Sequence, residues 1–286
     1  MARINPAQAV NRSSGGVGRK ARLAWACLLA GVMLLVPFAR VFAACEEYIG
    51  QQFRENKHLA SAQAPFTIAQ AGSDVYLRWL GHSSFLIISQ KGIKGLTDPN
   101  SAYPLDDEVA VVTMSNNHIT HSDTSALKGK PVILSGLDAR GNPVRVNRFF
   151  NDLQVQNLVT TPGPVGINTI FMYKTGGICI AHLGNLITQL TPSQVRTLQD
   201  VDVLLVPIHG FGSASRWDEI LNVISQLKPR LAIPMHYDHP GRAQAFVEFV
   251  GDRLPVKKAR TTSILLHRGS LPRPSLLLIL GAPDGT

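Results

Sequence analysis

The stretch "VAVVTMSNNHITHSDTSAL", residues 109–127, decides what kind of fold this chain can adopt. An apolar run from Val109 to Met114 ends in a polar turn that carries His118 and His121. A buried strand followed by such a turn is where an α/β enzyme would hold a metal ion, because a rigid strand fixes the loop that follows it. Asparagine and threonine stand where a hydrolytic metal site usually has carboxylates. The question is whether this loop still binds a metal.

Short β-rich segments with turn signals between them fill the chain from residue 75 onward. Several are continuously apolar, which is expected of strands that are covered on both faces. The predicted strands are "VYLRWL", "SFLIIS", "EVAVVT", "PVILS", "LQVQNLV", "TIFMYKT", "GICIAH", "DVLLVP", "RLAIPMH" and "SILLH", and the C-terminal "LPRPSLLLILGAPDGT" supplies a last one.

Predicted helices fall mostly in the second half of the chain. Thr191 to Gln194 form a capping box with a proline in the first turn, which predicts a helix start. A second helix shows one apolar stripe from Trp217 to Leu227, and a third begins at Pro240. Strands outnumber helices and do not alternate strictly with them. This pattern favours an α/β fold in which helices cover two packed sheets, over a doubly wound sheet or a barrel.

Residues 1–44 resemble an export signal. Basic residues precede a run of sixteen apolar residues, Leu23 to Phe38, and the small-residue site "VFAAC" follows. We expect cleavage after Ala43 or Ala44 and an exported protein, periplasmic or attached to the cell envelope. Two alternatives stay open: an uncleaved membrane anchor, although the run is short of the ~20 residues that span a bilayer, and a lipoprotein acylated at Cys45.

The net charge of +9 is concentrated in this leader. Without the leader, 22 basic side chains remain against 19 acidic ones, a net charge of +3. We see no basic stripe with interleaved aromatic residues, so nucleic acid is not an expected partner. The expected partner is a small-molecule substrate or ligand, with membrane contact only through an N-terminal segment that is uncleaved or lipidated.

The three cysteines exclude a thiolate zinc cluster. Cys27 would leave with the signal. Cys45 and Cys179 can then pair in an oxidising compartment, or Cys179, within the apolar segment "GGICIAH", can remain a buried free thiol. Any metal must therefore be bound by histidine, asparagine or aspartate.

Six of the nine histidines lie at or just beyond the end of a predicted apolar strand. A single histidine in such a place is more often structural than a metal ligand, but six in equivalent places favour a common site. They are His82, His118, His121, His182, His209 and His236.

A set of ordered motifs resembles the metallo-β-lactamase superfamily. The motifs are "YLRWLGHSSFLI", "GLTDP", the His118–His121 loop, "NTIF", "GGICIAHLGN" and "IPMHY". They are most similar to its L-ascorbate-6-phosphate lactonase-like and phospholipase-D-like hydrolase branch, over residues 75–237. The resemblance implies a four-layer αββα sandwich over residues 74–286, preceded by a lead-in at 45–73. It places the site at one edge, between the sheets.

The departures from the family pattern concern its metal ligands. The family loop reads His-x-His-x-Asp-His, and here Asn116 replaces the first histidine and Thr120 the aspartate. The bridging aspartate of the family's "H-L-G-D" motif is Asn185, and the histidine expected near residues 160–162 is absent. A neutral amide bridges two cations poorly, so a paired-metal centre is not expected.

The resemblance leaves His118, His121 and His236 as ligands. Three imidazoles suffice for one zinc ion with an open water position, although manganese or another divalent metal also fits. Other residues are expected to support the site or to substitute as ligands: Asp98, His182, His209, His82 and Thr120. Among them, Asp98 matches a family residue that steadies the ligand loop.

Two functions are compatible with this site. The first is metal-assisted hydrolysis of an ester, lactone, amide or phosphodiester, in which Asn116 and Asn185 hydrogen-bond the attacking water. The second is a non-catalytic binding protein that keeps the fold but has lost the metal centre.

Overall fold

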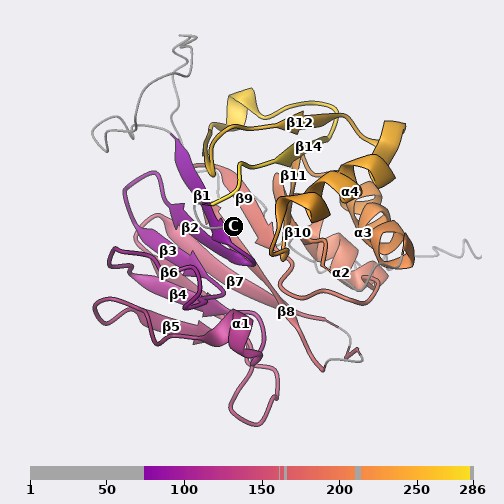
Figure 1. Cartoon of the computed structure of the whole chain (residues 1–286). Helices are drawn as coiled ribbons and strands as arrows, with labels where there is room; N and C mark the ends of the chain where they lie inside the picture. The colour runs from indigo at the N-terminus through magenta and orange to yellow at the C-terminus, as the bar shows by residue number, and fades with distance from the viewer. Residues whose placement is uncertain (1–73, 161, 164–165, 210–213, 284–286) are drawn as a thin grey trace, which may run out of the picture. The chain divides into compact units, whose positions relative to one another are not determined.

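The computed structural model describes residues 74–283 except 161, 164–165 and 210–213 (Figure 1), and all of these belong to one compact unit. The predicted signal (1–44) and lead-in (45–73) lie outside the described residues. Among the helices of the described part, none has the length and apolar character needed to cross a bilayer.

The strands form two sheets. The six-stranded sheet has the order β13 (Ser263–Leu266), β1 (Val75–Gly81), β2 (Ser84–Ile88), β3 (Lys94–Thr97), β4 (Val111–Met114) and β5 (Val132–Ser135). The eight-stranded sheet has the order β12 (Val256–Lys258), β14 (Leu276–Ile279), β11 (Leu231–Met235), β10 (Val203–Pro207), β9 (Ile178–His182), β8 (Thr169–Thr175), β7 (Leu153–Val159) and β6 (Asn147–Phe150).

Parallel pairing determines where the functional loops can meet. Strands β9, β10, β11, β14 and β12 all run in the same direction, so their carboxyl ends lie along one edge of the eight-stranded sheet (Figure 1). Strands β3, β4 and β5 are also parallel to one another. Ligands of open α/β sheets bind at such carboxyl ends.

An apolar core joins the two sheets. Phe85 of β2 and Tyr173 of β8 are among its largest fully buried side chains. The hydroxyl groups of Tyr173 and Thr113 share a hydrogen bond, which connects β8 to β4. At the end of β4 the carbonyl of Ser115 accepts hydrogen bonds from both the N–H and the hydroxyl of Thr169, each 2.9 Å long. These contacts fix the ends of β4 and β8 relative to each other.

Helices α2 (Pro192–Leu198), α3 (Ala214–Leu227) and α4 (Pro240–Val250) cover the eight-stranded sheet (Figure 1). The predicted capping box at Thr191 is confirmed, with both reciprocal hydrogen bonds present. The apolar stripe of α3 packs against the core as predicted. The remaining short elements are α1 (Ile119–Ser122), η2 (Gly251–Arg253) and η3 (Arg268–Ser270).

A second, smaller apolar cluster lies on the other face of the six-stranded sheet. It combines strand residues with residues of the loop that follows β3: Leu80, Leu86, Leu96, Leu105, Val109 and Val112. The predicted class, an α/β fold built on two packed sheets, is confirmed. Strands β3, β6 and β12 and helix α1 are additional to the predicted elements.

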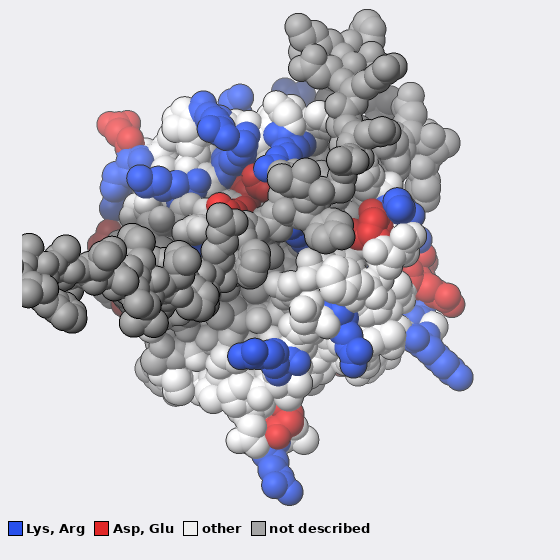
Figure 2. Space-filling view, turned by 180° about the vertical axis from the view of Figure 1, so that it is seen from behind, with Lys and Arg blue, Asp and Glu red and all other residues white. Residues whose placement is uncertain are grey.

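Charged side chains are mixed on the face drawn in Figure 2, where acidic residues lie among the basic ones. The expectation that nucleic acid is not a partner stays a prediction.

Candidate metal centre

Three buried histidines meet at the carboxyl ends of strands from both sheets. His82 directly follows β1, His236 directly follows β11, and His121 lies in α1 beyond β4. Their exposed fractions are 8%, 4% and 0%, respectively. One potential ligand nitrogen from each lies within 4.8 Å of the others. Because imidazole nitrogen is a good ligand for zinc and related ions, the three form a candidate metal centre.

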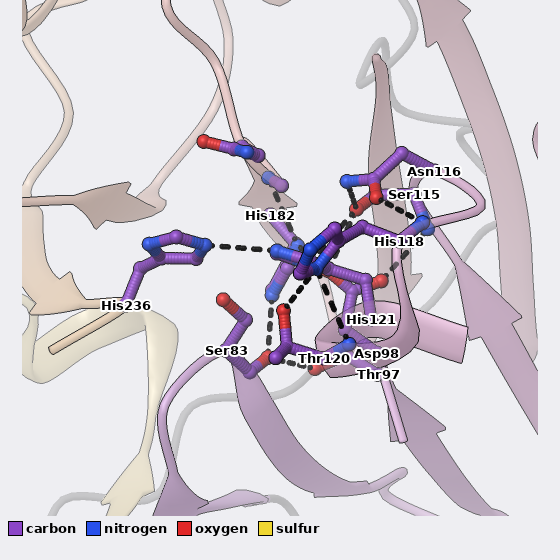
Figure 3. A network of polar contacts seen from close by, with 12 residues as sticks. Ser83, Thr97, Asp98, Ser115, Asn116, His118, Thr120, His121, His182 and His236 are labelled. Carbon is purple, nitrogen blue, oxygen red and sulfur yellow. Dashed lines mark hydrogen bonds and ion pairs between the residues drawn. The ribbon is translucent and has the colours of Figure 1, made fainter. Parts of the chain in front are cut away.

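A carboxylate determines which nitrogen of His121 faces the cluster. The Nδ1 atom of His121 lies 2.6 Å from Oδ2 of Asp98, and its Nε2 atom lies 2.8 Å from Nε2 of His236 (Figure 3). An ionised carboxylate only accepts hydrogen bonds, so Nδ1 carries a hydrogen, and Nε2 is the nitrogen that a metal ion would bind. This is how a carboxylate orients a metal-binding histidine.

Asp98 is itself held rigidly. Its two oxygens accept hydrogen bonds of 2.7 Å from the N–H and the hydroxyl of Ser115. Burial alone would raise the pKa of Asp98, but His182 and His121 and the hydrogen bonds of His121 and Ser115 lower it below its ordinary value. Asp98 is therefore ionised at neutral pH.

The buried nitrogens of the site fit a metal ion. The Nδ1 atoms of His82, His209 and His236 are buried and have no hydrogen-bond partner within the described part of the protein. A buried polar atom without a partner is costly and rare. Burial and the neighbouring His121 lower the pKa of His82 to about 4, and burial and His82 lower the pKa of His236 well below its usual value. Both imidazoles are thus neutral at pH 7, as metal coordination requires.

The backbone at the site is strained. His82, Asp98 and His236 have φ angles of 47°, 38° and 62°, a region that non-glycine residues seldom adopt. The N–H of His236 donates a 2.8 Å hydrogen bond to the carbonyl of His82, and the indole N–H of Trp79 donates one of 2.9 Å to the same oxygen. These bonds hold His82 and His236 in place before any metal binds.

His118 lies outside this cluster. It is the N-cap of α1, its ring is exposed, and its Nδ1 accepts a hydrogen bond from the N–H of Thr120 and contacts the Thr120 hydroxyl at 2.9 Å. The side-chain oxygen of Asn116 accepts from the N–H of His118, and its amide donates to Ser115. Of the three expected ligands, the structure brings His121 and His236 together, with His82 in place of His118. The reason is that the helical turn directs His118 toward its own backbone.

The other expected residues lie around the cluster. His182 uses both ring nitrogens, because Nε2 lies 2.8 Å from the carbonyl of Ser83 and Nδ1 accepts from the N–H of Gly184. The ring of His209 lies 3.8 Å from that of His236. The side-chain oxygen of Asn185 is buried without a hydrogen-bond partner in the described structure. His182 therefore serves to position its neighbours, whereas His209 and Asn185 have free polar atoms.

The sequence patterns did not predict the roles of two residues at the site. His82 was expected only as a supporting residue, although it follows a strand as directly as His236 does. Asp238 was not expected at all, yet its charge opposes the lowered pKa values of His82 and His209. The signal for Asp238 was its place two residues after His236.

Two packed β-sheets with a buried histidine cluster at the ends of their strands are characteristic of metal-dependent hydrolases with a metallo-β-lactamase fold. Residues 76–236 match the family model described as "Beta-lactamase superfamily domain", more than half of the chain. The chain belongs to this superfamily and is a metal-dependent hydrolase. The predicted family, fold and enzyme class are confirmed.

Relatives agree with this assignment. The chain is 30% identical over 186 residues to a UPF0173 protein of Pyrococcus abyssi, covering 58% of this chain and 85% of that protein. It is 29% identical over 192 residues to a UPF0173 metal-dependent hydrolase of Carboxydothermus hydrogenoformans, covering 57% and 84%. A putative Zn-dependent hydrolase of the metallo-β-lactamase superfamily from Thermotoga maritima is similar in fold, with a TM-score of 0.55 and 24% identity, over 72% of this chain and 98% of that one.

Proposed function

We propose that this hydrolase acts through one divalent metal ion, zinc, held by His82, His121 and His236. The observation that carries the proposal is the convergence of one nitrogen from each of these residues within 4.8 Å, with Asp98 behind His121. Imidazole ligands bring no negative charge and no carboxylate belongs to the described group, so the charge of a second cation would not be offset. Three ligands leave a position for water, as in catalytic zinc sites.

The bound metal would supply Lewis-acid chemistry, polarising the scissile carbonyl or phosphoryl group and lowering the pKa of water. The chain's own residues prepare this site. Asp98 fixes the tautomer of His121, and the backbone bond between His236 and His82 sets the distance between their strands. The side-chain oxygen of Asn185 is buried without a partner among the described residues, and it would accept a hydrogen bond from the attacking water. Ester, lactone, amide and phosphodiester substrates are all compatible with this chemistry.

Export is part of the proposal. The leader has the form of a secretory signal, and Cys179 is disulfide-bonded. Structural disulfides persist mainly in oxidising compartments outside the cytosol. The other two cysteines, Cys27 and Cys45, lie outside the described residues.

The test measures zinc per chain by elemental analysis after dialysis against a metal buffer, with folding followed by circular dichroism. We expect one zinc per chain in the wild type, none in His82→Ala or His236→Ala, and one in His118→Ala, which serves as the matched histidine control. Loss of zinc from His118→Ala with retention in His82→Ala would overturn the ligand assignment.

Hydrolysis is then measured on a chromogenic ester, a lactone, an anilide and a phosphodiester. We expect turnover of at least one substrate class that requires zinc and is lost in His82→Ala. Zinc binding without turnover of any class would favour the alternative, a binding protein on the same fold.

A further inference from the structure

A cavity of about 310 Å³ is lined in part by residues next to the cluster histidines in the chain, Tyr237 and Asp238 after His236. It is bounded by the start of α4 and by residues at or just beyond the carboxyl ends of β12 and β14, the edge where α/β sheets bind ligands. Its volume is at the lower end of the range for small-molecule sites, roughly 300–1,000 Å³.

Direct contacts connect the cavity to the histidines. Tyr237, which lines the cavity, follows His236 in the chain, and Trp79 donates its indole hydrogen bond to the carbonyl of His82. The rings of Trp79 and Tyr237 lie 4.7 Å apart. Asp238, another lining residue, lies two positions after His236 in the chain. Trp79 and Tyr237 therefore belong both to the wall of the cavity and to the chain segments that hold His82 and His236.

The apolar side chains in the walls of the cavity favour the binding of an apolar group. Two aromatic rings, from Trp79 and Tyr237, and three aliphatic side chains, from Ala243, Ile279 and Leu280, form much of its lining. All five are nearly or fully buried members of the main core. Apolar lining with few polar groups is typical of sites that bind an acyl or aryl group.

The charges at the cavity do not suit a phosphate. Among the described lining residues, Lys258 and Asp238 carry opposite charges. The ammonium of Lys258 already donates to the side-chain oxygen of Gln244, at 2.6 Å. Phosphate-binding sites usually contain several positively charged hydrogen-bond donors. A carboxylate at the same cavity would repel a phosphate group.

We propose that this cavity binds the acyl group of a carboxylic ester whose carbonyl carbon lies at the histidine cluster. The proposal rests on the proposed function of that cluster. In the reaction, the oxygen of water bonds to the carbonyl carbon and the bond to the alkoxy oxygen breaks. The alcohol leaves with one proton of the water, and the carboxylate and the second proton are released. An acyl chain longer than acetyl fills the cavity and gains binding free energy.

The first arm of the test compares p-nitrophenyl acetate, butyrate, hexanoate and octanoate with the zinc-loaded protein. We expect kcat/KM to rise about fourfold for each added methylene until the cavity is full. Ala243→Phe narrows the cavity and should abolish this rise, so that kcat/KM no longer increases from acetate to octanoate. Ala139→Phe, at an exposed loop position, is the matched control and should keep the wild-type series. Leu280→Ala enlarges the cavity and should move the optimum to longer chains.

The second arm measures binding without catalysis. Octanamide and acetamide are titrated calorimetrically into the protein after its metal has been removed by a chelator. We expect octanamide alone to bind, and Ala243→Phe to lose this binding. Equal kcat/KM for all four esters, or no octanamide binding to the wild type, would overturn the proposal. Octanamide binding without hydrolysis of any ester would instead show that the hydrolase proposal has failed and that the cavity is an acyl-binding site.

Discussion

The carboxylate behind His121 offers a sharp test of how the site is built. In Asp98→Asn, the buried side chain keeps its shape but loses its charge and one acceptor. If its oxygen stays on the N–H of Ser115, its NH₂ group faces Nδ1 of His121. That ring nitrogen must then accept, so the ring hydrogen moves to Nε2, where it blocks the ligand lone pair. If the amide is turned round, its NH₂ group faces the N–H of Ser115, donor against donor.

The magnitude follows from the hydrogen bonds in the structure. A hydrogen bond to a charged group contributes about 1.5–3 kcal/mol and a neutral one about 0.5–1.5 kcal/mol. The 2.6 Å contact between Asp98 and His121 should therefore lose on the order of 1–1.5 kcal/mol. The change of tautomer adds to this loss. We expect zinc affinity to fall about 10–100-fold, the range seen when such supporting carboxylates are removed.

Zinc affinity is measured by competition with a chromogenic chelator at pH 7, and folding by urea unfolding of the metal-stripped proteins. Asp107→Asn is the matched control, because Asp107 pairs with Lys94 away from the cluster and should leave affinity unchanged. A folded Asp98→Asn protein with an affinity within about twofold of the wild type would refute the role of Asp98 in orienting His121.

Four other predictions follow from the sequence and the site. In the metal-stripped protein, burial lowers the folded-state pKa of His82 to about 4, below the unfolded value. Because the unfolded chain binds the proton first as the pH falls, the free energy of unfolding should decrease by up to about 3 kcal/mol between pH 6.5 and 4. Urea midpoints measured across this range should depend less on pH in His82→Gln than in the wild type. The envelope-derived protein should begin at Ala44 or Cys45 by N-terminal sequencing, and an intact Met1 or Ala2 on most molecules would refute the signal. Alkylation of the exported protein, denatured without a reductant so that buried thiols are accessible, should leave Cys179 unlabelled, whereas labelling of Cys179 would exclude its disulfide. Thr120→Asp combined with Asn185→Asp should raise the metal content toward two ions per chain, because anionic ligands attract and bridge divalent ions. No gain in the folded double variant would mean that these residues no longer hold the positions of the family's metal ligands.

Local patterns predicted most of the fold. The capping box at Thr191 and the continuously apolar strands depend on neighbours in the chain, so they could be recognised without tertiary information. Strand β12 contains only Val256–Lys258 and β6 is an exposed edge strand, so neither shows a periodic apolar pattern. Such strands form because a neighbouring strand offers hydrogen bonds, which a single sequence does not reveal.

The candidate site shows the same limit. The spacing of His118 and His121 places both in one loop, but it does not say which ring turns inward. That is determined by α1 and by the hydrogen bond between His121 and Asp98. His82 joins His236 through a backbone bond between the two sheets. This pairing is a tertiary contact, and the sequence motif around His82 carries no sign of it.

The division of the cluster between the two sheets has a mechanical consequence. His82 and His121 follow strands of the six-stranded sheet, whereas His236 follows a strand of the eight-stranded sheet and lies 115 positions beyond His121. An ion held by all three would act as a reversible cross-link that closes a long loop of chain. A covalent cross-link over a loop of that length restricts the unfolded chain by on the order of 4–5 kcal/mol. Metal supply in the surroundings would then govern the lifetime of the folded protein as well as its turnover.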